Sequence, residues 1–381
     1  MVVCPASRGV TMQRLTKHTI AFTVGMGLAA AGCGDNLGDD AGPDAAAPAT
    51  RTAYAVSGDF GTTGVFSTID VLGRTVRPNA LAGVAGGDPF LRAIGDELLI
   101  VNRDSGENVT VLGGAPLALI DQYATGGGSN PQDVAVVGGK LYVPVLGGSG
   151  VVVIDRATHA SHAVAIPGDP DGKPDCVSAA AVGAEVYVAC GLLDDTFTPR
   201  GDGLIAVIDT ATDTVTATVA MPAANPVGVF APTADGALLI GTAPSFTDFA
   251  TGCVVRVAPG APRPTATCAV TNAQLGGLAN HIDVGPDGDV VIAVTGFAPD
   301  FSSQFGRLRM VDHTTFAPGA VMSKDGQQID DVAACGDGYV VAADGTMGAS
   351  GVRIFKDGQE TTTAPLDIGR PTGFGNNLAC R

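Results

Sequence analysis

The sequence predicts an all-β protein, a seven-bladed β-propeller closed by pairing of its N-terminal and C-terminal strands. The chain of 381 residues has 54 Gly, 24 Pro and no Trp, with 45% hydrophobic and 15% charged residues. This composition is typical of an all-β chain rich in turns. In addition, a unit of four apolar runs recurs at intervals of about 42 to 54 residues, the size of a four-stranded blade. Incomplete units stand at both ends of the chain.

The repeated unit is clearest in residues 130–168. It begins with Asn-Pro and continues with an alternating apolar run, a Gly turn, a second run, another Gly turn, a third run ending in Ile-Asp, and a fourth run. Alternation with a period of two residues predicts strands. Weaker copies begin near Pro89, Pro174, Pro226, Asn280 and Ile329. Each copy therefore predicts one blade.

The two ends of the chain supply parts of one further blade. Residues 53–83 resemble the second, third and fourth strands of a unit, without a first strand. Residues 370–381, from Pro371, resemble a first strand with nothing after it. Combining the two parts closes the ring and hides edges that an open stack would expose. The predicted propeller spans 51–381.

Two segments carry a resemblance to a known family. Residues 134–145, VAVVGGKLYVPV, and 203–242 resemble repeats of the bacterial YVTN-type β-propeller family, which share Asn-Pro, Val-x-Val, Leu/Val-Tyr-Val and Val-x-Val-Ile-Asp-Thr. The resemblance covers 130–242 well and the rest of 52–381 as a pattern. It implies the propeller fold. It leaves activity open, because the family includes surface proteins of unassigned role and some lactonase-like enzymes.

The segment before the propeller predicts export. Arg14 and Lys17 precede an apolar run, 19–31, that is too short to span a bilayer, and Met12 offers an alternative start. The run ends in LAAAGC at Cys33, which resembles the lipobox of bacterial lipoproteins. The resemblance implies a signal peptide over 1–32 and lipidation of Cys33.

Two details refine this prediction. Ala30 stands where the lipobox usually has Leu, Val or Ile, so a soluble secreted protein is the alternative. Gly34 follows the cysteine in place of Asp, which by resemblance favours an outer-membrane lipoprotein facing the periplasm or the cell surface. After Cys33, residues 34–50 lack core-forming side chains and predict a disordered tether.

Charge and cysteines limit the partners and the compartment. The formal net charge of −17 leaves no basic footprint for phosphates, so nucleic acid is not expected as a partner. Apart from Cys4 and Cys33, six cysteines remain, an even number that favours disulfides in an exported chain.

The blade map selects among the fifteen ways of pairing six cysteines. Cys176 and Cys190 flank the turn at Gly183, and Cys253 and Cys268 flank another hairpin turn. Elimination pairs Cys335 with Cys380, which would tie the last full blade to the closing strand. The alternative, a zinc site, lacks CxxC spacing and nearby histidines.

Aspartates recur where the third runs end, at Asp70, Asp155, Asp209 and Asp312. Aligned carboxylates could bind metal. The favoured interpretation is a turn in which each carboxylate accepts hydrogen bonds from backbone N–H groups two residues onward.

The starts of the first strands converge near one mouth of the central channel. The residues predicted at this mouth are Phe90, Gln132, Asp175, Val227, His281, Asp330 and Thr372, with Asp133, Asp283 and Asp331 beside them. They indicate a site for a cation or a small polar ligand, with Gln132, Asp175 and Asp330 as binding candidates. His281 and Asp283 are the candidate base pair if the protein is an enzyme. The alternative is a water-filled channel.

Three consecutive blades have long loops between their second and third strands, at 192–203, 242–252 and 295–306. These loops hold Phe197, Phe246, Phe249, Phe297, Phe301 and Phe305. Aromatic side chains on the loops of a rigid scaffold indicate recognition. The alternative is that each ring covers its own loop.

Two short matches are weak. Residues 200–202 spell Arg-Gly-Asp, and residues 169–175, DPDGKPD, place carboxylates as in a calcium loop but lack its distal Glu. No cofactor is predicted, with calcium as a minor alternative.

These observations predict a membrane-anchored propeller that acts as a binding or scaffold protein for an envelope protein or polymer. The alternative is a lactonase-like or lyase-like enzyme with its site in the channel.

Overall fold

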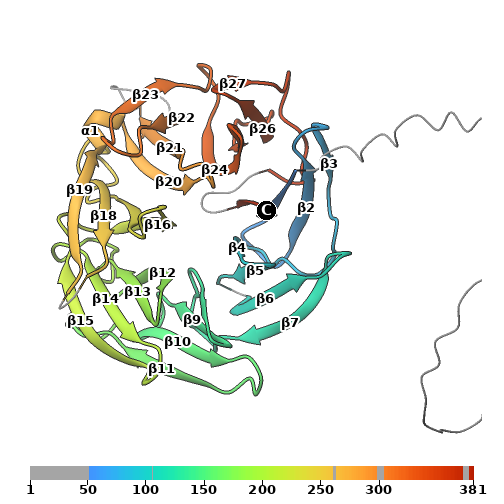
Figure 1. Cartoon of the computed structure of the whole chain (residues 1–381). Coiled ribbons are helices and arrows are strands. Elements are labelled where there is room, and N and C mark those ends of the chain that lie inside the picture. The colour runs from blue at the N-terminus through green and yellow to red at the C-terminus, as the bar shows by residue number, and fades with distance from the viewer. Residues whose placement is uncertain (1–50, 105, 261–262, 298–303, 372–376) are drawn as a thin grey trace, which may run out of the picture. The chain divides into compact units, whose positions relative to one another are not determined.

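The structure, a computed structural model, describes residues 51–104, 106–260, 263–297, 304–371 and 377–381. The predicted signal peptide and tether, together with Cys33, Phe301 and Thr372, lie outside these residues. The described chain forms seven four-stranded antiparallel sheets arranged in a ring (Figure 1), which confirms the predicted fold class.

Each blade is a sheet whose first-named strand lies nearest the channel. Blade 1 consists of β28 (Leu378–Cys380), β1 (Thr52–Gly58), β2 (Gly64–Asp70) and β3 (Thr75–Arg77). Blade 2 consists of β4 (Pro89–Ile94), β5 (Glu97–Asn102), β6 (Asn108–Gly113) and β7 (Ala118–Ala124). Blade 3 consists of β8 (Ala135–Val137), β9 (Lys140–Pro144), β10 (Gly150–Asp155) and β11 (Ser161–Ala165). Blade 4 consists of β12 (Cys176–Val182), β13 (Glu185–Cys190), β14 (Leu204–Asp209) and β15 (Thr214–Ala220).

The remaining blades follow the same order. Blade 5 consists of β16 (Pro226–Pro232), β17 (Leu238–Thr242), β18 (Cys253–Ala258) and β19 (Thr265–Thr271). Blade 6 consists of β20 (Leu278–Val284), β21 (Val290–Phe297), β22 (Gln304–Val311) and β23 (Pro318–Val321). Blade 7 consists of β24 (Ile329–Gly336), β25 (Tyr339–Asp344), β26 (Gly351–Lys356) and β27 (Gln359–Glu360).

The core lies between neighbouring blades. The second strand of a blade has a neighbouring blade on each face, so strands such as β5 and β13 are apolar and buried at consecutive positions. Fourth strands such as β15 alternate small polar and apolar residues, because one face is more exposed. One buried cluster joins Val151 and Val153 of blade 3 to Val186 and Val188 of blade 4.

Blade 1 closes the ring as predicted. Strand β28 pairs antiparallel with β1 through Ala53 with Cys380, Tyr54 with Ala379, and Ala55 with Leu378. The C-terminus consequently lies at the centre of the ring (Figure 1). The closing blade thus combines the last strand of the chain with its first three.

All three predicted disulfides are present. Cys176–Cys190 joins β12 to β13, Cys253–Cys268 joins β18 to β19, and Cys335–Cys380 joins β24 of blade 7 to β28 of blade 1. Disulfides form and persist in oxidising, exported compartments. The cysteine pattern therefore agrees with export.

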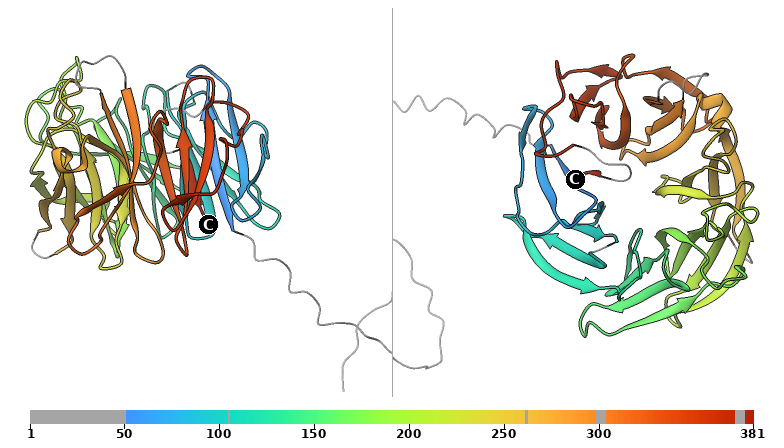
Figure 2. Two further views of the ribbon diagram at one scale, coloured as in Figure 1. Left: turned by 90° about the horizontal axis from the view of Figure 1, so that it is seen from above. Right: turned by 180° about the vertical axis from the view of Figure 1, so that it is seen from behind.

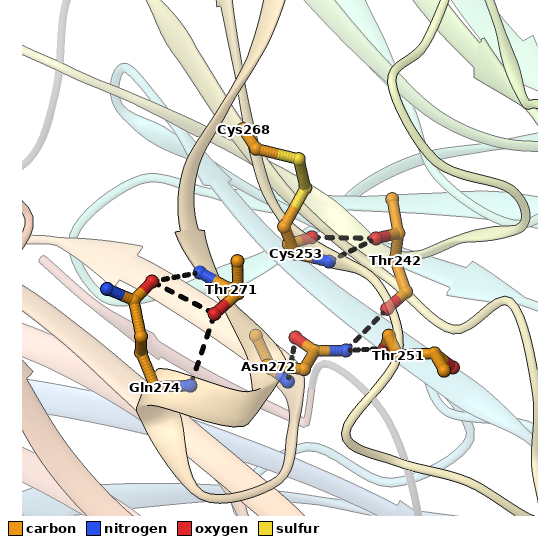
Figure 3. Close-up of a disulfide and its surroundings, with 8 residues drawn as sticks. Thr242, Thr251, Cys253, Cys268, Thr271, Asn272 and Gln274 are labelled. Atoms are coloured by element: carbon orange, nitrogen blue, oxygen red, sulfur yellow. Dashed lines mark hydrogen bonds between the residues drawn. A yellow bond between two sulfur atoms is a disulfide. The ribbon is translucent and has the colours of Figure 1, made fainter.

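A short helix, α1 (Asn272–Leu275), follows β19 and was not predicted. It begins with a capping box in which Thr271 Oγ1 accepts from Gln274 N and Thr271 N donates to Gln274 Oε1 (Figure 3). Beside it, Asn272 Nδ2 donates to the carbonyl oxygens of Thr242 and Thr251. The helix thus connects the Cys253–Cys268 blade to blade 6. Within the described residues, no helical segment has the length and hydropathy that a membrane span requires.

Alternating strand directions give the ring two distinct faces (Figure 2). The loops between second and third strands and the starts of the inner strands lie on one face, which we call the loop face. The turns between first and second strands and between third and fourth strands lie on the other, which we call the turn face. Thr52, at the start of a second strand, lies on the turn face.

Candidate functional site

The recurring aspartates stabilise turns, as predicted. Asp209 Oδ1 accepts from the backbone N–H groups of Ala211 and Thr212 at 3.1 and 2.9 Å. Asp155 and Asp312 do the same at their own turns, and Asp70 accepts from Gly73 N. Hydrogen bonds from the side chain and backbone of Thr212 lower the pKa of Asp209 below its usual range. These carboxylates lie on the turn face, each in a different blade.

The channel is lined by the inner edges of the blades, where unpaired backbone groups need partners. Asp133 Oδ2 accepts from Ala179 N of the next blade at 3.0 Å and from Ser178 Oγ at 2.8 Å. Ser178 Oγ in turn accepts from Phe230 N of blade 5 at 2.8 Å. These polar side chains therefore connect the inner strands of consecutive blades.

Arg92, which was not predicted, extends from blade 2 into the channel. Its Nε atom lies 3.2 Å from Asp133 Oδ1, and both terminal nitrogens approach the Phe230 carbonyl oxygen at 3.3 and 3.4 Å. The Asp133 side chain is fully buried, which raises its pKa, while Arg92 opposes that shift. Arg92 thus links blades 2, 3 and 5 across the channel.

His281 faces Asp331 rather than Asp283. The His281 Nδ1 atom contacts Asp331 Oδ1, and both side chains are buried. Burial lowers the pKa of His281 to about 3, with Arg92 adding to the effect. A neutral imidazole can still donate its Nδ1–H to the carboxylate. The imidazole and carboxylate that lie together in the channel are therefore those of His281 and Asp331.

Asp331 also accepts hydrogen bonds from the backbone at the start of the closing strand, β28. Its Oδ2 accepts from the backbone N–H groups of Leu378, at 2.8 Å, and Asn377, and its Oδ1 accepts from Val332 N at 2.8 Å. Asp283 has the same arrangement one blade earlier, accepting from Val284 N at 2.9 Å and Ala334 N at 2.8 Å. These carboxylates hold neighbouring inner strands together.

A cavity of about 540 Å³ occupies the part of the channel toward the turn face. All seven blades contribute to its lining, which includes Arg92, Ala180, Phe230, His281 and Asp283. Small side chains such as Ala180 leave the space open. Most of the residues that line the cavity are apolar, and three ionisable side chains, those of Arg92, His281 and Asp283, lie among them.

The three predicted polar binding residues are buried at the loop-face ends of the inner strands. Gln132 Nε2 donates to the backbone and side-chain oxygens of Asn130, and Asp175 Oδ2 accepts from Leu193 N at 2.8 Å. Burial raises the pKa of Asp175 to about 6 and that of Asp330 to about 7. Among the residues described, no group of three or more His, Cys, Asp or Glu has a metal-binding arrangement.

The raised pKa of Asp330 predicts a pH effect. Its folded-state pKa of about 7 exceeds the ordinary value of 3.8, so its charge destabilises the fold as pH rises through this interval. Asp330→Asn removes the charge and is expected to increase stability relative to wild type at pH 8 more than at pH 5. Urea unfolding at both pH values measures this difference. An equal effect of the substitution at both would contradict the prediction.

The predicted phenylalanine loops differ from one another. Phe197 and Phe246 lie on loops of blades 4 and 5 and are 61% and 55% exposed, whereas Phe249 is half-buried. The loop predicted over 295–306 is wrong at both ends, because β21 and β22 stay paired through Phe297 with Gln304. A Cβ added at Gly296 would clash with the Phe305 ring, so this ring covers its own hairpin. Phe297 belongs to β21.

Phe60, which was not predicted, is presented by a loop built like that of Phe197. Asp59 and Asp194 each accept, through Oδ1, a hydrogen bond from the N–H of a threonine four residues later. Both phenylalanines have positive φ, 54° and 58°, a conformation that bulky residues rarely adopt. The sequence signal is an Asp and a Thr four residues apart that enclose an aromatic residue.

The Arg-Gly-Asp segment at 200–202 and the segment 169–175, which resembles a calcium loop, are joined by ion pairs. Arg200 lies 2.9 Å from Asp171 and 3.7 Å from Asp169, so its guanidinium pairs with carboxylates of the segment that resembles a calcium loop. Arg200 Nε also donates to the Leu193 carbonyl oxygen. The Arg-Gly-Asp arginine thus holds the 169–175 segment against the Phe197 loop.

Comparison with known proteins identifies a fold without a family. No protein-family model matches the chain, and no curated protein matches it. Apo AztD from Citrobacter koseri is similar with a TM-score of 0.51 and 13% identity, over 87% of this chain and 98% of that chain. A second AztD structure from that organism gives 0.51 and 12% over the same shares. Hydrazine synthase from Kuenenia stuttgartiensis gives 0.47 and 17%, over 69% and 74%. At these identities, the likeness to AztD shows that the two proteins share the β-propeller fold.

Proposed function

We propose that the protein is an exported, membrane-anchored β-propeller that binds a partner protein at the cell envelope through its loop face. The supporting observation is where exposed apolar side chains lie. Within the described residues, seven large hydrophobic side chains are exposed, and four of them, Phe60, Phe197, Phe246 and Met347, are on loop-face loops. The other three, Leu119, Ile120 and Val321, are on outer strands.

These four side chains form two pairs on neighbouring blades. Phe197 and Phe246 belong to blades 4 and 5, and Met347 and Phe60 belong to blades 7 and 1. The aspartate-to-threonine hydrogen bonds fix the loops that carry Phe60 and Phe197, so a partner would meet side chains already in place. Two preformed apolar contacts on opposite sides of one face favour a partner broad enough to span the channel mouth.

The described chain begins on the turn face, opposite these loops. The chain therefore enters the ring on the face opposite the proposed contact loops. An envelope polymer is the other class of partner, and photo-crosslinking distinguishes it from a protein.

Replacing Phe60, Phe197 and Phe246 together by serine is expected to leave the fold intact. Exposed side chains outside a packed core change the free energy of unfolding by about 0.5 kcal/mol or less each. Urea unfolding of this variant measures the change. A loss of several kcal/mol would mean that the rings pack on their own loops and would contradict the proposed role.

Site-specific photo-crosslinking tests the binding proposal itself. A photoreactive phenylalanine at Phe197 or Phe246 in the native envelope is expected to give a discrete, protease-sensitive adduct. The matched control places the same group at Ala211, an exposed residue of the turn face. A protease-resistant ladder would indicate a polymer instead, and equal adducts at Ala211 would contradict the proposal.

A lactonase-like or lyase-like activity is the second candidate. The observation that favours it is the His281–Asp331 contact beside the channel cavity, because a carboxylate that orients an imidazole supports general-base catalysis. Hydrolysis of a lactone by the purified protein, lost in His281→Ala, would support this candidate. Activity that survives the substitution would reject His281 as the base.

A further inference from the structure

The channel cavity has the size of a small-molecule site. Its volume of about 540 Å³ falls within the roughly 300–1,000 Å³ that ligand pockets in proteins occupy. Most of the residues that line it are apolar, among them Leu91, Ala180, Phe230 and Ile282. An apolar body would therefore fit the space.

The charges in this wall are not balanced. Arg92 is paired with the fully buried Asp133, and His281 contacts Asp331. Asp283 accepts one backbone hydrogen bond on each carboxylate oxygen, and within the described residues it makes no ion pair. Each of its oxygens keeps a second lone pair for another donor. At pH 8 an ionised Asp283 therefore gives this wall a surplus negative charge that Arg92, already paired with Asp133, does not neutralise.

A ligand that neutralises this surplus must bring a positive group. An uncharged ligand would leave Asp283 without a counter-ion, and a carboxylate ligand would add to the repulsion. The net charge of −17 on the whole chain also raises the local concentration of small cations. The cavity chemistry thus favours a compact cationic head on an apolar body.

We propose that the channel cavity binds a small molecule that carries a protonated amine on an apolar body, with Asp283 as its counter-ion. This site lies toward the turn face, away from the loop-face surface. A ligand here can therefore bind independently of the proposed partner protein.

Three matched probes test the proposal on the unaltered protein. Hexylamine, hexanol and hexanoate share an apolar chain and differ in charge. Isothermal titration calorimetry at pH 8 is expected to show hexylamine binding at least tenfold more tightly than the other two. Equal affinity for hexanol and hexylamine would mean that the cavity recognises only the apolar chain. Preference for hexanoate would assign Arg92 as the recognising charge. Either result, or no binding of hexylamine, would overturn the proposal.

Two further measurements identify the residue. Asp283→Asn is expected to reduce hexylamine affinity at least tenfold, whereas Asp209→Asn, at an exposed turn outside the channel, is expected to leave it unchanged. If Asp283→Asn fails to fold, the pH dependence of the wild-type protein supplies the same information. Burial raises the pKa of Asp283 to about 6, and Arg92 opposes this shift.

Hexylamine affinity is expected to fall as the pH is lowered. An alkyl amine stays protonated below pH 9, since its pKa is about 10. Hexylamine affinity is therefore expected to fall about tenfold from pH 8 to pH 5, as Asp283 takes up a proton. The ionisable groups that face the cavity with it are Arg92, paired with Asp133, and His281, beside Asp331. An affinity that does not change over this range would contradict the role of Asp283.

Discussion

Replacing Asp331 by alanine is expected to lower the free energy of unfolding by about 3–5 kcal/mol, because it leaves several buried hydrogen-bond donors without an acceptor, at about 1–3 kcal/mol each. The substitution leaves the N–H groups of Val332, Asn377 and Leu378 without their acceptor and takes away the partner of His281. Buried donors without partners each carry a desolvation cost. Two of these donors precede or begin β28, so the effect falls on ring closure.

Urea unfolding followed by circular dichroism measures this loss. Asp209→Ala is the matched control, because it removes a carboxylate that accepts two backbone hydrogen bonds at an exposed turn, where water can replace it. A loss for Asp331→Ala no greater than that for Asp209→Ala would contradict the assigned role.

Removing the Cys335–Cys380 disulfide by serine substitution at both positions is expected to cost about 4 kcal/mol, from the loop-closure entropy of a 45-residue separation. The Cys176–Cys190 pair, with a separation of 14, is the control and is expected to cost about 3 kcal/mol. The larger effect should come from the bond that crosses between blades.

Both double-serine variants are compared with wild type by urea unfolding without reductant. In the presence of reductant that opens the disulfides, the advantage of wild type over each variant is expected to disappear. If the Cys335 and Cys380 variant lost less stability than the Cys176 and Cys190 variant, the disulfide between blades 7 and 1 would contribute little to closure of the ring.

The order of the blades could be predicted from local patterns. Apolar residues alternate every second position within a strand, and the same turns recur between strands, so both signals can be seen in short segments of sequence. Strands β4, β16 and β24 begin at the predicted Pro89, Pro226 and Ile329. The pairing of the cysteines followed from that order. These features depend on which residues are neighbours along the chain.

The channel wall was predicted less accurately, because which residues face the channel depends on the register with which each inner strand pairs. Pairing shifts register between Ala279 and His281 in β20, and between Ile329 and Asp331 in β24. A shift of one residue exchanges the two faces of a strand. The carboxylate that reaches the closing strand is accordingly Asp331, next to the predicted Asp330. Arg92 gave no local signal, because its partners Asp133 and Phe230 come from other blades.

The loop face was predicted in part for a related reason. Phe197 and Phe246 lie in segments that are visibly long, whereas the loop of Phe60 is short and resembles an ordinary turn. Its similarity to the Phe197 loop rests on hydrogen bonds from Asp59 and Asp194, which spacing alone suggests but does not establish.

Strand β28 determines when the ring can be completed. Blade 1 has no inner strand until Leu378–Cys380 is available, and β1 pairs with it through three residues. In a chain that is threaded across a membrane from its N-terminus, the first blade must wait, with one edge unpaired, until the last residues arrive. On the far side of that membrane, the ring can then close only after the last strand has crossed.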